Sequence, residues 1–157
     1  MTTATDSRTT VDSRSLARAR RSELDELFRR SSPGPLPQGT ARGTAILLPG
    51  SPANRVLGAL IRFLVWKGKV FNPQSGDLKN LLGPLGNRGI RAKVYQDKSW
   101  FAEGAAIILD YSHTSFVARM IRDEIREVSP GVYLGQVYWG KRRIALFTLE
   151  FPPQSFS

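Results

Sequence analysis

The chain has 157 residues, which is enough for one domain with a hydrophobic core. It contains no cysteine and one histidine, which excludes disulfides, thiolate nucleophiles and a multi-histidine metal site built by one chain, and we expect neither metal nor cofactor. The net charge of +10 favours polyanionic partners such as nucleic acid or anionic lipid.

The N-terminal residues 1–21 are rich in Thr, Ser, Arg and Asp and contain few large apolar groups. Such a composition cannot bury enough surface to offset the ordering entropy, so it predicts a disordered basic tail. No apolar segment typical of a signal peptide is present, and the longest apolar run, 56–66, is about half of the roughly 20 residues that span a bilayer. We expect a cytoplasmic protein.

A helix is predicted over residues 22–30, with Ser22 as its cap and Asp25 at the capping-box position. The prolines of residues 31–39 should end this helix. Alternating or continuous apolar patterns then predict strands, with Ile90, Ala92 and Val94 on one face of the fourth. The predicted strands cover 40–48, 65–71, 77–82 (an ambiguous segment), 89–95 and 105–111, and a short helix covers 54–64.

Residues 115–128 show helical spacing of apolar side chains and predict an amphipathic helix. Its charged side chains could bind a carboxylate or phosphate, but we favour a solvated face because Asp123 lies among the arginines. The apolar stripe is Val117, Met120, Ile121, Ile125 and Val128, and the charged face is Arg119, Arg122, Asp123 and Arg126.

Two final strands, 132–139 and 142–151, flank Gly140-Lys141, a pair typical of a two-residue type II′ hairpin turn. Six or seven strands with sparse helices predict a mainly β fold, either a small antiparallel barrel or a half-barrel. The N-terminal helix and the helix before the C-terminal hairpin would cover its ends or edges. We expect one domain over 22–151, followed by a tail at 152–157.

The segment "ILDYSHTS", 108–115, holds the first candidate site. Asp110 could orient His113 or act as a base, and His113 could titrate near neutral pH. The alternative is a purely structural role, in which a strand leads into a helix capped by Ser112 or Thr114. Asp110 and Tyr111 lie on opposite faces of a strand end, so only one of them can face the barrel interior.

Basic and aromatic side chains alternate in two of the predicted strands, a pattern that nucleic-acid-binding sheets use to hold phosphates and stack bases. The same side chains could line the mouth of a barrel that holds an apolar ligand with an acidic head. They are Trp66, Lys67, Lys69, Phe71, Arg91, Lys93 and Tyr95. Walker A, G-x-S-x-G, zincin and G-x-G-x-x-G motifs are absent from the sequence, which speaks against the chemistries they serve.

Several short segments resemble the GXWXG domain joined to the uncharacterised domain that usually follows it. "GTARG", 39–43, stands where that family has Gly-x-Trp-x-Gly, with Ala41 in place of the tryptophan. "VWKGKVF", "AKVY", "ILDYS" and "YLGQVYWG" are similar in order and spacing, over about residues 22–151. The resemblance implies a lipocalin-like small barrel, hence a calycin-like fold, and implies no activity.

Binding of a small hydrophobic or amphipathic, lipid-like ligand in the barrel cavity is the leading functional hypothesis. The polar anchors would be Tyr95, Asp110, Tyr111 and Tyr138, and the apolar walls Trp66, Trp139 and Phe147. The first alternative is a metal-independent enzyme with Asp110 or His113 as acid or base and Arg122 as the anion holder. The second is nucleic-acid binding through the basic surface. A variant of the leading hypothesis adds contact of Arg62, Lys67 and Lys69 with an anionic membrane surface, peripheral to the bilayer.

Overall fold

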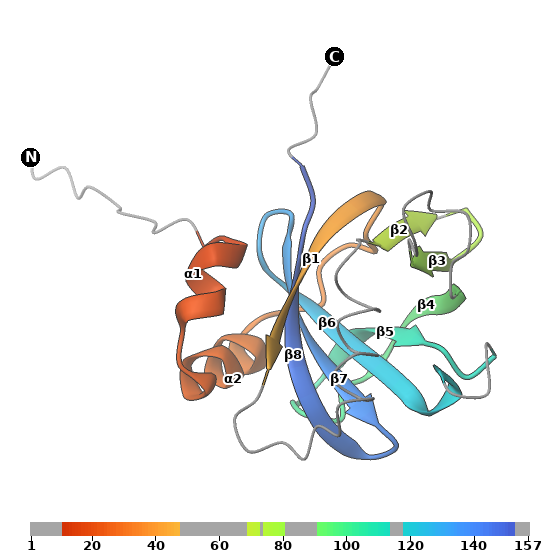
Figure 1. Cartoon of the computed structure of the whole chain (residues 1–157). Coiled ribbons are helices and arrows are strands. Elements are labelled where there is room, and N and C mark those ends of the chain that lie inside the picture. Colours follow the sequence, from red (N-terminus) through yellow and green to blue (C-terminus); the bar gives the residue numbers. More distant parts are fainter. Residues whose placement is uncertain (1–10, 48–68, 73, 81–90, 114–117, 153–157) are drawn as a thin grey trace, which may run out of the picture.

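A computed structural model of the chain describes residues 11–47, 69–72, 74–80, 91–113 and 118–152. Eight strands in these residues close into one antiparallel barrel, in which sequence neighbours pair and β8 pairs with β1 (Figure 1). The predicted mainly β, calycin-like fold is thereby confirmed, as a barrel rather than a half-barrel. The strands are β1 (Gly39–Leu47), β2 (Lys69–Asn72), β3 (Asp77–Asn80), β4 (Arg91–Lys98), β5 (Ala105–Asp110), β6 (Ile121–Ser129), β7 (Val132–Trp139) and β8 (Arg142–Glu150).

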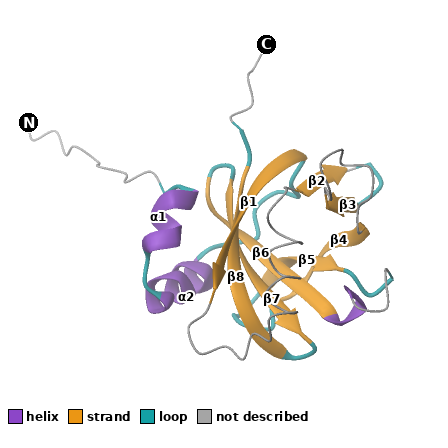
Figure 2. Ribbon diagram, viewed as in Figure 1, coloured by secondary structure: helices purple, strands orange, loops and turns teal. Residues whose placement is uncertain are grey.

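Two helices, α1 (Ser13–Arg18) and α2 (Arg21–Arg30), lie against one side of the barrel (Figure 2). Helix α1 falls within the tail that we expected to be disordered, so that expectation is wrong for this segment. The Asp12 carboxylate caps α1 by accepting a hydrogen bond of 2.8 Å from the Ser15 backbone N–H, and Leu16 is buried. One buried leucine and a good cap anchor a segment whose composition is otherwise polar. Residues 1–10 and 153–157 of the predicted tails lie outside the described residues.

Helix α2 confirms the predicted helix but begins one residue earlier, after Arg20 as the N-cap. The Glu23 carboxylate accepts a hydrogen bond of 2.9 Å from the Arg20 backbone N–H, so the predicted cap at Ser22 is wrong. Asp25 is no capping-box partner either. Its carboxylate accepts two hydrogen bonds from Arg143 of β8, 2.7 and 3.2 Å long, and so ties the helix to the barrel.

The amphipathic helix predicted over 115–128 is wrong for residues 121–128, which belong to β6. A short 3₁₀ helix, Ala118–Met120, precedes the strand, and residues 115–117 lie outside the described part. Charged side chains occur on both faces of β6, so the apolar and polar residues do not alternate as in an ordinary strand. Both faces are nevertheless buried between Asp123 and Arg126, and on the outer face Glu124 and Arg126 find partners in the elements that cover the barrel.

Alternate positions on the strands divide the core into an interior cluster and an outer cluster. The interior cluster draws on β1, β2 and β4 to β8, and the outer cluster joins the strands to α1 and α2. Strand β5 contributes to both, as expected of a strand that is apolar on both faces. The interior cluster comprises Ala41, Phe71, Ala92, Ile107, Leu109, Tyr111, Ile121, Ile125, Tyr133, Val137, Ile144, Ala145, Phe147 and Leu149. The outer cluster comprises Leu16, Leu24, Phe28, Ala106, Ile108, Val132, Leu134 and Leu146.

The predicted C-terminal hairpin is confirmed: Trp139 pairs with Arg142 around the two-residue turn, and Gly140 adopts a φ of 59°. Strand β2 overlaps the end of the segment predicted over 65–71, and β3 confirms the ambiguous segment as a strand. The helix predicted over 54–64 lies outside the described residues. Among the helices that the structure describes, none is long and apolar enough to cross a membrane.

Candidate ligand pocket

The Asp110 carboxylate lies on the outer side of the barrel, whereas Tyr111 is fully buried in the interior cluster. Asp110 Oδ2 accepts a hydrogen bond of 3.0 Å from the Tyr95 hydroxyl, and Oδ1 accepts one of 2.9 Å from the Ser112 backbone N–H. Partial burial alone would raise the pKa of Asp110, but the hydrogen bonds from Ser112 and Tyr95 and the nearby His113 lower it. These contacts give Asp110 the role of a turn-stabilising group.

Arg122, the predicted anion holder, is engaged by groups of the chain itself. Its Nη1 atom lies 2.8 Å from Glu124 Oε2, and its Nη2 donates to the Lys98 carbonyl at 3.1 Å. The guanidinium carbon also lies 4.0 Å from the centre of the Trp100 ring. His113, which the enzyme hypothesis offers as an acid or base, is exposed. The enzyme hypothesis therefore gains no support from this end of the barrel.

The Glu124 carboxylate is fully buried on the outer side of β6. In addition to Arg122 it accepts hydrogen bonds from the Ser99 hydroxyl, at 2.7 Å, and from the Trp100 backbone N–H, at 2.9 Å. Tyr138 packs edge-to-face on Trp100, and burial, helped by the charge of Glu124, raises the pKa of Tyr138 to about 12. This cluster holds the loop after β4 against β6 and β7.

The predicted wall residue Trp66 lies outside the described residues, and the other two lie in or beside the interior cluster. The Phe147 ring lies so close to Gly135 that a Cβ atom there would collide with it, and Trp139 is partly buried against the same cluster. Neither Phe147 and Trp139 nor the predicted polar anchors Tyr95, Asp110, Tyr111 and Tyr138 line the pocket at the end of the barrel where β7 begins.

Arg126 has a structural role that the sequence did not reveal. It is 2% exposed, and its guanidinium donates to five backbone carbonyls, of which three belong to the end of α2. Burial lowers the pKa of Arg126, and the charge of Glu124 partly offsets this effect. The carbonyl end of a helix carries partial negative charge, which stabilises a buried cation. The five acceptors are Phe28, Arg29, Ser31, Glu103 and Ala105.

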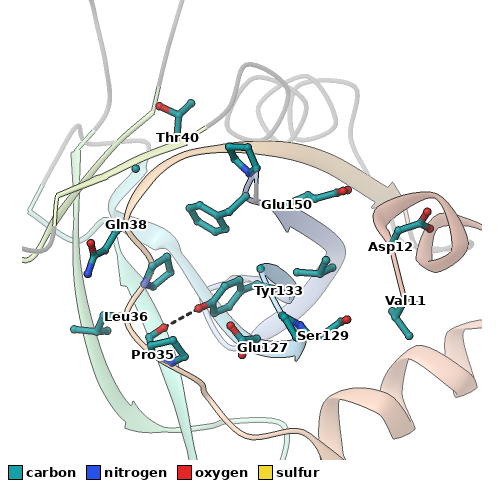
Figure 3. A pocket seen from close by; sticks show the side chains of 17 residues that line it. Val11, Asp12, Pro35, Leu36, Gln38, Thr40, Glu127, Ser129, Tyr133 and Glu150 are labelled. Carbon is teal, nitrogen blue, oxygen red and sulfur yellow. Dashed lines mark hydrogen bonds between the residues drawn. The ribbon is translucent and has the colours of Figure 1, made fainter. Parts of the chain in front are cut away.

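An open pocket of about 620 Å³, the Tyr133 pocket, lies at the end of the barrel where β1 and β7 begin and β6 and β8 end (Figure 3). This volume falls within the range of small-molecule sites. Prolines, aromatic rings and aliphatic groups supply most of its wall. The lining residues are Val11, Asp12, Pro35, Leu36, Pro37, Gln38, Gly39, Thr40, Glu127, Ser129, Pro130, Gly131, Val132, Tyr133, Glu150, Phe151 and Pro152.

Aromatic rings form one wall of the Tyr133 pocket. Phe151 lies between Phe71 and Tyr133, with both ring-centre distances at 5.6 Å. The Tyr133 hydroxyl donates a hydrogen bond of 2.7 Å to the Pro35 carbonyl, and this bond holds the proline-rich segment before β1 over the barrel end (Figure 3). Burial, and then the charge of Glu127, raises the pKa of Tyr133 well above its ordinary value.

Among the described residues that line the Tyr133 pocket, the charged side chains are all carboxylates. Glu127 is the cross-strand partner of Tyr133, and its carboxylate lies near the Tyr133 hydroxyl (Figure 3). Glu150 ends β8, and Asp12 is already occupied as the cap of α1. No lysine, arginine or histidine occurs among the described lining residues. In the described part of the chain, no group of three or more His, Cys, Asp or Glu residues could hold a metal ion.

Tyr133, Glu127 and the proline-rich segment are parts of a site that the sequence patterns did not predict. Glu127 lies in the segment predicted as a helix, Tyr133 in a predicted strand, and the prolines of residues 31–39 were expected only to end a helix. The available signal was a Gly-Pro pair, Gly34-Pro35, and a Pro-Gly pair, Pro130-Gly131, since connecting segments often carry binding residues. Their proximity depends on the pairing of β6 with β7 and on the closure of β8 on β1.

No family model and no curated protein matches this chain, so its resemblance to the GXWXG domain stays an expectation. A solved structure, described as a protein from Thermomonospora curvata, is similar in fold. It shares 21% sequence identity and a TM-score of 0.57, and the match covers 85% of this chain and 88% of that chain. At this identity the likeness supports the fold alone.

Proposed function

We propose that this protein binds a small, mainly apolar or amphipathic ligand in the Tyr133 pocket. The observation that carries the proposal is a pocket of about 620 Å³ with aromatic and proline walls and a lining that is mostly apolar. Such a composition is typical of small-molecule sites, in which apolar contacts supply affinity and a few polar groups set orientation. The pocket's position at a barrel end also agrees with where barrels bind ligands.

A neutral fluorescent probe, N-phenyl-1-naphthylamine, tests this proposal on the full chain. We expect saturable binding that weakens when Leu36→Trp adds bulk at the rim or Phe151→Ala removes a wall. Circular dichroism and thermal melting check that both variants fold. Because Trp100 is half exposed but lies outside the pocket, Trp100→Ala serves as an aromatic control. Failure of the probe to saturate, or equal binding by all variants, would contradict the proposal.

Nucleic-acid binding is a second proposal, and the observation that favours it is on β4. Arg91 and Lys93 are exposed there on the same outer face as Tyr95, in a chain with a net charge of +10. Its test is retention of a single-stranded oligonucleotide over a range of salt concentrations. Binding that falls steeply with salt, and that Lys93→Gln weakens, is the expected result. Binding indifferent to salt would contradict it.

A further inference from the structure

We propose that the ligand of the Tyr133 pocket is an organic cation with an apolar tail, such as an alkylammonium. This inference rests on the proposed function and adds the chemical class of the ligand to it. The net charge of the chain and the charges at the pocket lining have opposite signs. The whole chain carries +10, yet the charged side chains among the described lining residues are three carboxylates, Asp12, Glu127 and Glu150, and none of these lining residues is basic.

The two carboxylates that matter are those of Glu127 and Glu150, since Asp12 is engaged in capping α1. No lysine or arginine in the described part of the chain lies within ion-pair distance of either glutamate. Arg42 is the cross-strand neighbour of Glu150 but does not line the pocket. Both glutamates are partly buried beside apolar groups, where a carboxylate loses hydration and gains most from an opposite charge.

Glu127 lies beside the aromatic wall, because it is the cross-strand partner of Tyr133. The Tyr133 hydroxyl donates to the Pro35 carbonyl and also lies within hydrogen-bonding reach of the Glu127 carboxylate, which helps to raise the pKa of Tyr133. A carboxylate offers about four acceptor sites and one hydroxyl proton can fill only one of them, so Glu127 can still accept from, or pair with, a group that enters the pocket. A ligand cation would reach Glu127 and the rings of Tyr133 and Phe151 from the same space, as all three line it.

Aromatic ring faces attract cations, and they do so best when the cation is weakly hydrated, as alkylammonium groups are. Carboxylates next to aromatic rings therefore favour an ammonium headgroup, while the prolines and Val132 offer surface to its tail. The same lining disfavours an anionic headgroup. It would meet two carboxylates and no basic partner among the described lining residues. The pocket thus differs from a fatty-acid site in the sign of the charge it accepts.

Calorimetric titration of the full chain with three probes of equal tail length tests the inference. The probes are octyltrimethylammonium, octan-1-ol and octyl sulfate, used below concentrations at which they aggregate. We expect octyltrimethylammonium to bind at least about tenfold more tightly than octan-1-ol, a ratio that one ion pair and one cation–π contact can supply. Octyl sulfate is expected to bind independently of the pocket, through the basic surface.

Substitutions of single glutamates test whether the preference for octyltrimethylammonium comes from the carboxylates of the pocket. Glu127→Gln keeps the shape of the side chain and should weaken octyltrimethylammonium about tenfold while leaving octan-1-ol unchanged. Glu150→Gln should weaken it less, because this residue lies at the rim beside Arg42. The matched control is Glu26→Gln, which makes the same charge change at an exposed site on α2 and should leave all three affinities unchanged.

The outcomes separate this inference from the proposal beneath it. Equal affinity for octan-1-ol and octyltrimethylammonium, both lost in Leu36→Trp, would overturn the cationic ligand and keep the pocket as a binding site. Cation binding that Glu127→Gln leaves unchanged would also overturn the inference. If no probe responds to Leu36→Trp or Phe151→Ala, both the ligand class and the proposed function fail.

Discussion

Two glutamates of β6, three residues apart, lie in two regions of the barrel and differ in the partners of their carboxylates. Glu124 faces the outer polar layer beneath the loop after β4, and it is paired with Arg122 and held by two further hydrogen bonds. Glu127 faces the Tyr133 pocket, and no basic residue of the described chain pairs with it. A buried charge whose partners are all internal stabilises the fold. A partly buried charge that lines a pocket without an internal counter-charge is available to a ligand.

The largest effect is expected in the outer layer, at Arg126. Replacing it by methionine leaves several carbonyls at the end of α2 and in the loop before β5 without their donor. Since each buried unsatisfied group costs about 1–3 kcal/mol, the variant should lose about 3–5 kcal/mol of unfolding free energy. Chemical denaturation measures the loss.

Arg30→Met is the matched control, because it removes an exposed arginine from the same helix end. Its unfolding free energy should change by less than about 0.5 kcal/mol. Equal losses in both variants would mean that Arg126 contributes through charge alone and does not hold α2 in place.

The comparison of the two glutamates becomes quantitative with Glu124→Gln and Glu127→Gln. The first removes the ionic partner of Arg122 and one of the carboxylate's acceptor sites, so we expect a loss of about 2 kcal/mol. The second removes a charge without an internal basic partner and should change stability by less than about 0.5 kcal/mol in either direction. Denaturant midpoints of the two variants, measured in parallel, show which substitution lowers the stability more. A larger loss at Glu127 would reverse the roles assigned to the two regions.

Within the pocket region, the Tyr133 hydroxyl has a structural contribution that can be separated from ligand binding. Tyr133→Phe removes the hydrogen bond to the Pro35 carbonyl and should cost about 1 kcal/mol. The proline-rich segment should also become more accessible to proteolysis, since this bond holds it over the barrel end. Limited proteolysis before and after addition of octyltrimethylammonium reports this. Unchanged cleavage in the variant would show that packing alone holds the segment.

The smallest effect concerns Asp110 and is a dependence on pH. Its pKa is lowered in the folded state, so its contribution is present above the unfolded pKa of about 3.9 and is lost as the pH falls through the folded value. Because the group is only partly buried, solvent screening should limit the contribution to a few tenths of a kcal/mol. Asp110→Asn should thus be slightly less stable than the parent chain at pH 7 and equal to it near pH 2. A difference that grows towards low pH would have the wrong sign.

Local patterns were sufficient wherever a segment carried its own signal. The alternation in β4 predicted that Ala92 and Val94 face inwards and that Lys93 is exposed, and the structure agrees. The turn at Gly140 predicted the last hairpin, and the leucines of residues 22–30 predicted α2. In each case the signal and the structure span a few neighbouring residues.

Strand β6 shows where local patterns fail. Its apolar residues fit a helical stripe as well as a strand, and its charges looked solvated. The strand state is favoured because β5 and β7 pair with it along its length, while α2 and the loop after β4 supply partners for Arg126 and Glu124. Those partners are between 21 and 98 residues away in the chain, so no short window of the sequence contains them.

The sequence by itself determined the class of the fold, since alternation, turn chemistry and the absence of cysteine are properties of short segments and of composition. It also determined the net charge and with it the attraction for anions at the surface as a whole. Only the tertiary structure decided which residues form a pocket, because closure of β8 on β1 brings Phe151, Glu127 and the prolines before β1 to one end of the barrel. The same closure left carboxylates at the lining of that pocket in a basic protein, a local charge that composition cannot express.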